Sequence, residues 1–382
     1  MYTPSLFSLA LLASGVTAQM SLSQAIAANN GTLSTLSMLL GQQPALAGAL
    51  SNTSSGITVL APSNAAFAKF LAMPANKAAV GQSDIVAAVL QYHVLNGTFP
   101  ASKFTNEAQF VPTLLTNESY TQVTGGQVVQ VALNGSNAVI TTGLKETSTT
   151  TQTDIMFNGG VIHIIDTVLT IPLSPAMSAI DSNLLSLAGA LTKTSLVDPV
   201  NSLNDVTIFA PSNDAFEKIG DTAAALPTTQ LSQILEYHVL NGTVGYSTLL
   251  TTGLANESFP TLMGESLTVT SENSKVFINS AQVITTDIIV SNGVMHVIDN
   301  VLNPSNETVV ENPTAATQPV AFEGATSAAS PPFTSGIMAT TTAPSAAMDT
   351  NIKTGAGDKM LNGERLGGAV AAVMGAAAMM IL

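Results

Sequence analysis

A repeat of four sequence blocks dominates this chain of 382 residues. Each block occurs twice, and the order is the same in both copies, which chance similarity does not produce. The blocks are residues 57–69 and 206–218, 90–98 and 235–243, 117–120 and 256–259, and 160–166 and 293–299. Each copy has the length of a whole domain, about 100–150 residues, rather than that of a solenoid unit. The chain is therefore predicted to fold as two similar domains in tandem.

Each copy begins with a segment in which apolar residues recur at helical spacing. It continues with segments in which apolar and polar residues alternate as in β-strands. Residues 21–50 and 174–191 carry apolar residues at helical spacing. A short β-branched run then ends in Ala-Pro-Ser-Asn, in which the serine is a natural N-cap for the next helix. The rest of each copy alternates in the manner of antiparallel hairpins. We predict two α+β domains, over residues 19–172 and 173–303.

The copies differ in length between the blocks. The first copy takes 101 residues from Pro62 to His163, and the second takes 85 from Pro211 to His296, a difference of 16. Loops tolerate such insertions better than helices or strands do. The first domain is therefore expected to have longer loops.

Three motifs recur in fixed order in both copies. They are a strand ending in Ala-Pro-Ser-Asn-x-Ala-Phe, a Tyr-His-Val-Leu block about thirty residues later, and a terminal Gly-Val-x-His-x-Ile-Asp. This combination resembles the fasciclin (FAS1) domain family over residues 21–302. The first copy departs slightly, with Asn158-Gly159-Gly160 where the second has Ser291-Asn292-Gly293. The resemblance implies two wedge-shaped β-sandwich domains with flanking helices, in a secreted or lipid-anchored adhesion, matrix or cell-wall protein.

The Tyr-His block is the candidate adhesion motif. In animal members of the family this block is implicated in integrin binding, and the matching positions are Tyr92, His93, Tyr237 and His238. The sequence contains no Arg-Gly-Asp, and its stalk and anchor signal resemble fungal or plant members, for which no integrin partner is implied. We predict that adhesion depends on the region after the Tyr-His helix, where an exposed aromatic, aliphatic neighbours and a turn coincide. A core position for the tyrosines is the open alternative, since tyrosine occurs both in cores and at interfaces.

Catalytic and metal chemistry are not indicated. All four histidines lie inside repeat blocks, at positions 93, 163, 238 and 296, and each copy lacks a carboxylate cluster with ligand spacing. The absence of cysteine excludes disulfides and thiolate sites. His238 lies on the apolar stripe of its helix, so we expect a buried, hydrogen-bonded histidine. The sequence predicts no enzyme, no cofactor and no metal.

Charged residues make up only 9% of the chain, and the net charge is −14. The single arginine is Arg365, so nucleic acid is not an expected partner. Eight Asn-x-Ser/Thr sequons could supply the missing surface polarity as N-glycans. They are Asn30, Asn52, Asn96, Asn117, Asn134, Asn241, Asn256 and Asn306.

Both ends of the chain resemble processing signals. Residues 1–18 read as a signal peptide, and residues 304–355 as a disordered Ser/Thr/Pro-rich stalk. Residues 356–382 match a GPI-attachment propeptide, with Gly355 as the predicted ω-site. The alternative is a tail-anchoring helix, but the apolar run of 16 residues spans about 24 Å, short of the ~30 Å hydrocarbon core.

Two functions of different classes remain. The first is a GPI-anchored adhesion or matrix glycoprotein at the extracellular face of the plasma membrane or in the cell wall, which binds extracellular proteins or cell-wall polysaccharides. The second is a surface-tethered protein that binds a small ligand, a lipid or a glycan. A concave apolar pocket would favour the second, and a flat glycan-free face the first.

Overall fold

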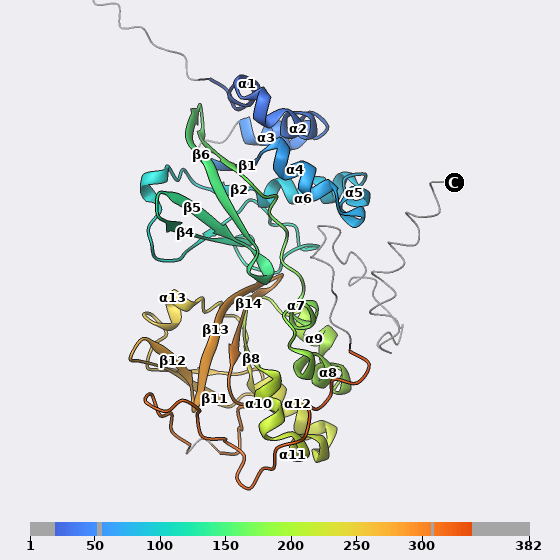
Figure 1. Cartoon of the computed structure of the whole chain (residues 1–382), viewed down its shortest axis with the longest axis vertical. Coiled ribbons are helices and arrows are strands. Elements are labelled where there is room, and N and C mark those ends of the chain that lie inside the picture. The colour runs from blue at the N-terminus through green and yellow to red at the C-terminus, as the bar shows by residue number, and fades with distance from the viewer. Residues whose placement is uncertain (1–19, 52–55, 307–308, 338–382) are drawn as a thin grey trace, which may run out of the picture.

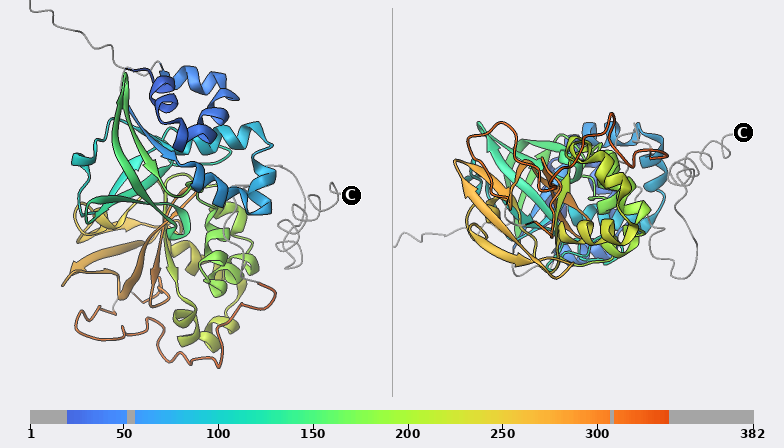
Figure 2. Two further views of the ribbon diagram at one scale, coloured as in Figure 1. Left: turned by 45° about the horizontal axis from the view of Figure 1, so that its top comes forward. Right: turned by 90° about the horizontal axis from the view of Figure 1, so that it is seen from below.

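Two similar α+β domains are stacked end to end in the structure, a computed structural model that describes residues 20–51, 56–306 and 309–337 (Figure 1). In both domains most of the helices lie on one side and the sheet on the other, and the two helical layers share the same side of the molecule (Figure 2). The predicted tandem α+β architecture is confirmed.

The elements of domain 1 follow the predicted order, helices first. The helices are α1 (Leu22–Ala28), α2 (Asn30–Gly41), α3 (Pro44–Ser51), α4 (Asn64–Leu71), α5 (Pro74–Ala79), α6 (Ser83–Tyr92), and the short η1 (Ala101–Lys103) and η2 (Gly143–Lys145). The strands are β1 (Ile57–Pro62), β2 (Val94–Asn96), β3 (Gln109–Pro112), β4 (Val128–Asn134), β5 (Asn137–Thr141), β6 (Thr147–Phe157) and β7 (Gly160–Ile165).

Domain 2 repeats this plan with shorter connections. Its helices are α7 (Pro175–Asp181), α8 (Leu185–Lys193), α9 (Val197–Asn201), α10 (Asn213–Lys218), α11 (Gly220–Ala225), α12 (Thr228–Tyr237) and α13 (Ser247–Leu250). Its strands are β8 (Val206–Pro211), β9 (Val239–Leu240), β10 (Glu257–Pro260), β11 (Ser266–Glu272), β12 (Lys275–Ile278), β13 (Ala281–Val290) and β14 (Gly293–Ile298).

Each domain has one seven-stranded sheet that bends into two layers. The order in domain 1 is β2-β1-β7-β6-β5-β4-β3, and in domain 2 it is β9-β8-β14-β13-β12-β11-β10. The long strands β6 and β13 pair with one neighbour near their start and with another over the rest of their length, where two register shifts interrupt the pairing. Bulges of this kind let a strand pass from one layer to the other. The outer edges also approach each other, through isolated bridges from Leu95 to Thr113 and from Leu240 to Thr261.

Three of the four repeated blocks occupy the same places in both domains. The predicted match of 117–120 with 256–259 is wrong, because 117–120 lie in the loop after β3 whereas residues 257–259 belong to β10, the counterpart of β3. Strand β1 runs parallel to β7 with Leu60 opposite His163, and β8 runs parallel to β14 with Phe209 opposite His296. The terminal block starts with glycine in both copies because a Cβ at Gly160 or Gly293 would lie 2.0 Å from the carbonyl oxygen of the neighbouring strand. The first and last blocks therefore produce the same pair of parallel strands in both domains.

The Ser-Asn pair after each Ala-Pro begins a helix, as predicted. Ser63 Oγ accepts a hydrogen bond from the Ala66 amide at 3.1 Å, which caps α4, and Ser212 does the same for α10. The asparagine has a separate role. Asn64 Oδ1 accepts the Thr35 amide of α2 at 2.9 Å, and Asn213 Oδ1 accepts the Ser186 amide of α8 at 3.0 Å. Each asparagine thus joins two helices of its domain.

The two domains share an interface built from the longer loops of domain 1. Thr113 and Gln127 close a loop by a backbone hydrogen bond of 2.8 Å, whereas the matching loop of domain 2 spans only 262–264. From the domain 1 loop 114–126, the Gln122 amide donates to Ser291 O at 2.9 Å, and the Thr124 amide donates to Asp205 Oδ1 at 2.7 Å. An apolar cluster lies beside these contacts and comprises Val128, Tyr246, Ile289 and Val294, with Phe110 and Val244 packed against it. The inserted loop, residues 114–126, therefore binds domain 1 to domain 2.

Residues 309–337, here called the strap, form neither helix nor strand but lie against domain 2. The strap passes beyond the lower end of the sheet and then along α11, α10 and α8 (Figure 1). Val320, Phe322, Ala325, Phe333 and Ile337 pack on the helical core of the domain. The absence of regular secondary structure agrees with the stalk expected from residue 304, but the sequence reading missed this packing. Residues 1–18, the proposed ω-site Gly355 and the propeptide lie outside the described residues.

Candidate functional site

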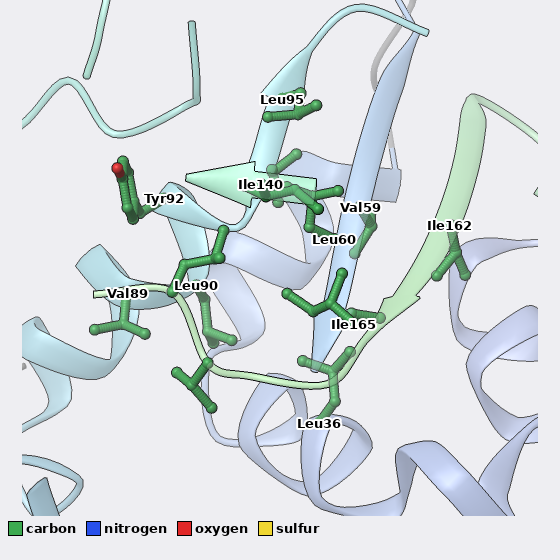
Figure 3. Packing of buried hydrophobic residues seen from close by; sticks show 14 of the residues in the cluster. Leu36, Val59, Leu60, Val89, Leu90, Tyr92, Leu95, Ile140, Ile162 and Ile165 are labelled. Carbon is green, nitrogen blue, oxygen red and sulfur yellow. The ribbon is translucent and has the colours of Figure 1, made fainter. Parts of the chain in front are cut away.

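Both tyrosines of the candidate adhesion motif lie in the core. Tyr92 ends α6, Tyr237 ends α12, and each side chain is 0% exposed. Figure 3 shows Tyr92 among buried side chains, with Val89 and Leu90 from the same helix. The prediction of an exposed aromatic at this block is wrong. The helix turns its apolar face inward, and the tyrosine follows because its hydroxyl finds partners inside.

The hydrogen-bond partners of both tyrosines are on the sheet or in a turn between its strands. Tyr92 Oη donates to Val128 O of β4 at 2.9 Å. Tyr237 Oη donates to Ser266 O of β11 at 3.0 Å and accepts from Asn279 Nδ2 at 2.8 Å. Burial raises the pKa of the Tyr92 hydroxyl well above its usual range. Each tyrosine therefore links the end of a helix to the opposite layer of its domain.

The histidines that follow the tyrosines are buried and fully hydrogen-bonded, as predicted for His238. Nδ1 of His93 lies 2.7 Å from Val89 O, and a carbonyl only accepts, so Nδ1 carries the proton. Nε2 then accepts the Leu169 amide at 2.9 Å. His238 repeats the pattern with Ile234 O at 2.6 Å and the Leu302 amide at 2.9 Å. Burial lowers the pKa of both rings to about 4.

The second histidine of each domain is held by an aspartate that the sequence reading missed. Nε2 of His296 donates to Gly245 O at 2.8 Å, and Nδ1 accepts the Asp287 amide at 3.2 Å. Asp287 has a left-handed backbone (φ 59°) at the bulge of β13, and its carboxylate accepts the Ser247 amide at 2.7 Å.

Domain 1 has the same arrangement around His163. Nε2 donates to Phe99 O at 2.7 Å, Nδ1 accepts the Asp154 amide at 3.3 Å, and Asp154 Oδ1 accepts the Ala101 amide at 2.9 Å. Burial lowers the pKa of His163, as it does that of His296. A repeated Thr-Asp-Ile at 153–155 and 286–288, nine residues before each histidine, was the signal available in the sequence.

These four histidines form structural contacts and leave no ring nitrogen for a ligand. Both nitrogens of each ring are engaged by the main chain. Among the residues that the structure describes, no three His, Asp or Glu side chains come close enough to hold a metal ion. Within the same residues, no helix is long and apolar enough to cross a membrane. The buried blocks thus support the fold, and their tyrosine and histidine side chains do not reach the surface of the domains.

The surface next to each block carries a sequon. Asn96 ends β2, Asn241 follows β9, and both side chains are exposed. Four further sequon asparagines are exposed, namely Asn30 at the start of α2, Asn117 in the inserted loop, Asn134 at the end of β4 and Asn256 before β10. Asn306 differs: it is half-buried, and its Nδ2 donates to Ala321 O of the strap at 3.2 Å. Asn52 lies outside the described residues.

Two apolar cavities in the described part of the chain are small. One lies between the helices and the sheet of domain 2 and is lined by Leu187, Leu191 and Met295. The other lies among the helices of domain 1 and is lined by Phe67, Phe70 and Val89. The volume open to the centre of a water-sized sphere is about 10 Å³ in the domain 2 cavity and about 20 Å³ in the domain 1 cavity. That is space for about one water molecule, far below the several hundred Å³ of a small-molecule site. They provide no pocket for a lipid or another small ligand.

Comparison with known proteins agrees with the repeated plan. The model of the Fasciclin domain matches residues 31–172 and 182–304. A fasciclin-like arabinogalactan protein of Arthroderma benhamiae is 34% identical over 307 residues, which are 80% of this chain and 72% of the relative. One from Cercospora beticola is 28% identical over 232 residues, 59% of this chain and 61% of the relative, so the match spans less than two thirds of that protein. A FAS1 domain pair from the insect cell adhesion molecule Fasciclin I is 22% identical and aligns with a TM-score of 0.35 over 72% of this chain and 98% of the pair.

Proposed function

Because this chain belongs to the fasciclin domain family, we propose that it is a cell-surface or cell-wall adhesion glycoprotein that binds extracellular proteins or wall polysaccharides through its two FAS1 domains. The family assignment supports the general role, as does the similarity to fungal fasciclin-like arabinogalactan proteins. The observation that carries the specific proposal is the distribution of sequons over the molecule.

The sequons leave part of the helical side free, although exposed Asn30 lies at the start of α2 on that side. None of the eight falls within residues 64–92 or 175–237, which contain α4–α6 and α7–α12. These helices lie on the common helical side of the two domains, away from the sheets that bear Asn134 and Asn256 (Figure 2). In domain 2 the strap covers part of that side. We therefore assign partner binding to the outer surface of α4, α5 and α6 in domain 1.

The Tyr-His blocks enter this proposal as supports of the surface. Tyr92 and His93 hold the end of α6 against the sheet, and Tyr237 and His238 do the same for α12. Substituting them would affect adhesion by displacing these helices rather than by removing a direct contact.

The proposed mature protein begins at about residue 19 and is attached through a glycolipid at Gly355. The apolar run after residue 5, the small residues before Gln19 and the uncharged C-terminal run support this assignment. It would place the two domains at the extracellular face of the plasma membrane, or in the wall after transfer.

A new glycan on the helical side tests the proposal. Gln82 and Asp84 are exposed at the start of α6, and the paired change Gln82→Asn with Asp84→Thr creates a sequon there. The matched control is Ala108→Thr, which creates a sequon at exposed Asn106 before β3. Binding of the purified glycoproteins to cell-surface proteins and to wall polysaccharides is then measured side by side.

We expect the α6 glycan to abolish binding and the Asn106 glycan to preserve it, with occupancy of both new sites verified by mass spectrometry. Equal binding by the two variants would remove the helical side of domain 1 as the adhesive surface. A protein that binds none of the extracellular materials before modification would contradict the adhesive function itself.

A further inference from the structure

The strap makes specific contacts with three helices of domain 2. The Ala328 amide donates to Glu217 O at 3.0 Å, and the Asp221 amide donates to Thr326 O at 3.4 Å. Phe333 lies edge-on to Phe216, with the ring centroids 6.1 Å apart at 89°. These contacts combine backbone pairing with an aromatic anchor, which is how grooves hold extended peptides.

Two glycines make room for the strap. A Cβ at Gly189 of α8 would lie 1.8 Å from Phe333 O, and a Cβ at Gly220 of α11 would lie 2.3 Å from Ala328 Cβ. Any side chain at these positions would displace the strap. A third contact closes the site, because Lys193 Nζ lies 4.9 Å from the centroid of the Phe333 ring.

Domain 1 has large side chains where domain 2 has these glycines. The paired contacts Thr35–Asn64 and Ser186–Asn213 align α2 with α8 and α4 with α10. In this alignment Met38 matches Gly189, and Leu71 matches Gly220. Met38 is 58% exposed, and Leu71 packs on the domain 1 core. The two domains share a fold, but at these two positions only domain 2 has glycines, which leave room for a peptide backbone on the helices.

We propose that α8, α10 and α11 form a binding groove for an extended apolar polypeptide with an aromatic anchor, and that residues 319–337 of the same chain are its resident ligand. The groove is defined by Gly189, Lys193, Phe216, Glu217, Gly220 and Asp221. The segment begins where Asn300 Nδ2 and Asn303 Nδ2 donate to Pro319 O at 3.1 Å and Ala321 O at 3.0 Å. The folded part of domain 2 therefore extends beyond the last residue of the matched family domain, 304.

Filling the groove with the side chains of domain 1 tests the proposal in the full chain. The variants are Gly189→Met and Gly220→Leu. The matched control is Gly41→Met, at the exposed end of α2, where a Cβ meets no atom within 4 Å. Hydrogen exchange is followed in peptides from 319–337 and from the sheet of domain 2.

We expect exchange in residues 319–337 to rise by about tenfold or more in both groove variants, with the sheet unchanged and the control like the wild type. Unchanged protection of the strap in Gly189→Met and Gly220→Leu would overturn the groove. Since either variant could instead unfold domain 2, a second test leaves the groove intact and changes only the strap.

That test uses Phe333→Ala in the full chain and a fluorescent synthetic peptide of residues 319–337. Fluorescence anisotropy should show the peptide binding to Phe333→Ala, and binding at least about tenfold weaker to the wild type, whose groove is occupied. Equal binding to both proteins, or to neither, would contradict the proposal. The wild type should also be monomeric in sedimentation, because a dimer with a protected strap would place the segment of a second copy in the groove and overturn the assignment within one chain.

Discussion

The hydroxyl of Tyr92 donates a hydrogen bond of 2.9 Å to the carbonyl oxygen of Val128, and the Val128 side chain belongs to the apolar cluster between the two domains. Tyr92 thus contacts a residue that itself lies in the interface between the domains. The hydroxyl of Tyr237, in contrast, contacts Ser266 and Asn279, which lie within domain 2. The same motif therefore supports different surroundings in the two copies.

Substitutions of the two tyrosines should separate core packing from hydrogen bonding. Tyr92→Ala or Tyr237→Ala should lower the free energy of unfolding by about 3–5 kcal/mol, because each empties a buried aromatic site. Tyr92→Phe loses one hydrogen bond and should cost about 1 kcal/mol. Tyr237→Phe leaves two partners unpaired and should cost more than Tyr92→Phe. Chemical denaturation measures all four, and loss of adhesion in a Tyr→Phe variant of unchanged stability would restore a direct binding role.

The buried histidines should make the protein less stable in acid. The pKa of His93 and His238 is lowered in the fold to about 4 from the usual value near 6.5. The unfolded chain therefore binds more protons below pH 6.5, and stability falls as the pH drops from 6.5 to 4. Each histidine should remove about 2–3 kcal/mol between pH 7.5 and 4.5.

The variant His93→Gln provides the measurement, because it removes one titrating ring. Its deficit in unfolding free energy relative to the wild type should shrink as the pH falls. Asp181 acts in the opposite direction, since burial raises its pKa to about 6 and the folded state then binds the additional proton. Asp181→Asn should steepen the acid loss. A deficit for His93→Gln that stays constant from pH 7.5 to 4.5 would argue against a neutral buried ring.

Removing the inserted loop should uncouple the domains. Replacing residues 114–126 by the three residues 262–264 of domain 2 deletes the contacts of Gln122 and Thr124 with domain 2. Calorimetry should then resolve two transitions, and small-angle scattering should give a larger radius of gyration. Because the deletion also removes the sequon at Asn117, Asn117→Gln is the control and should behave as wild type. A single compact species after the replacement would assign the coupling to the Phe110–Tyr246 stack, whose rings lie 4.1 Å apart.

Glycan occupancy should follow the exposure of the sequons. Asn30, Asn96, Asn117, Asn134, Asn241 and Asn256 are exposed and should carry N-glycans in the secreted protein. Asn306 should be unmodified, since the nitrogen that would carry the sugar donates to Ala321 O. Site-by-site mass spectrometry gives the answer, and full occupancy of Asn306 would mean that the strap docks differently there.

The proposed anchor can be tested on cells. Phosphatidylinositol-specific phospholipase should release the protein into the aqueous phase, because a glycolipid at Gly355 would be its only attachment. Peptides from residues 367–382 should be missing from surface-purified protein. Their detection there would contradict the anchoring assignment, and a trypsin-accessible surface protein that resists the phospholipase would favour the tail-anchoring alternative, provided that inositol acylation is excluded.

The repeat allowed much of the fold to be predicted, because its blocks are strand pairs and helix starts with local causes. Pro62 and Pro211 end strands, Ser63 and Ser212 cap helices, and Gly160 and Gly293 allow two strands to approach. Each of these roles follows from the chemistry of one residue and its immediate neighbours. Such signals can be read before any tertiary contact is known.

Features that depend on tertiary contacts could not be predicted from the sequence. Helical spacing identifies the apolar face of α6, but a tyrosine at its end suits the core or the surface, and only the position of Val128 O decides between them. The strap has the composition of an unstructured stalk, with few bulky residues, so its docking was not foreseen. The exchange of Met38 and Leu71 for Gly189 and Gly220 lies outside the repeated blocks, and the contacts of Asn64 and Asn213 are needed to align it. It acquires meaning only when Phe333 and Ala328 are seen above those glycines.

If the chain is anchored at Gly355 as proposed, docking of the strap also limits how far the domains can stand from the membrane. If the whole segment 304–355 were free, its 52 residues could extend about 175 Å at about 3.4 Å per residue. With the chain held on domain 2 as far as residue 337, only residues 338–355 separate the last described contact from Gly355, and these 18 residues reach at most about 60 Å. An occupied groove would keep the domains close to the lipid surface, and an emptied one would let them search almost three times farther for a partner.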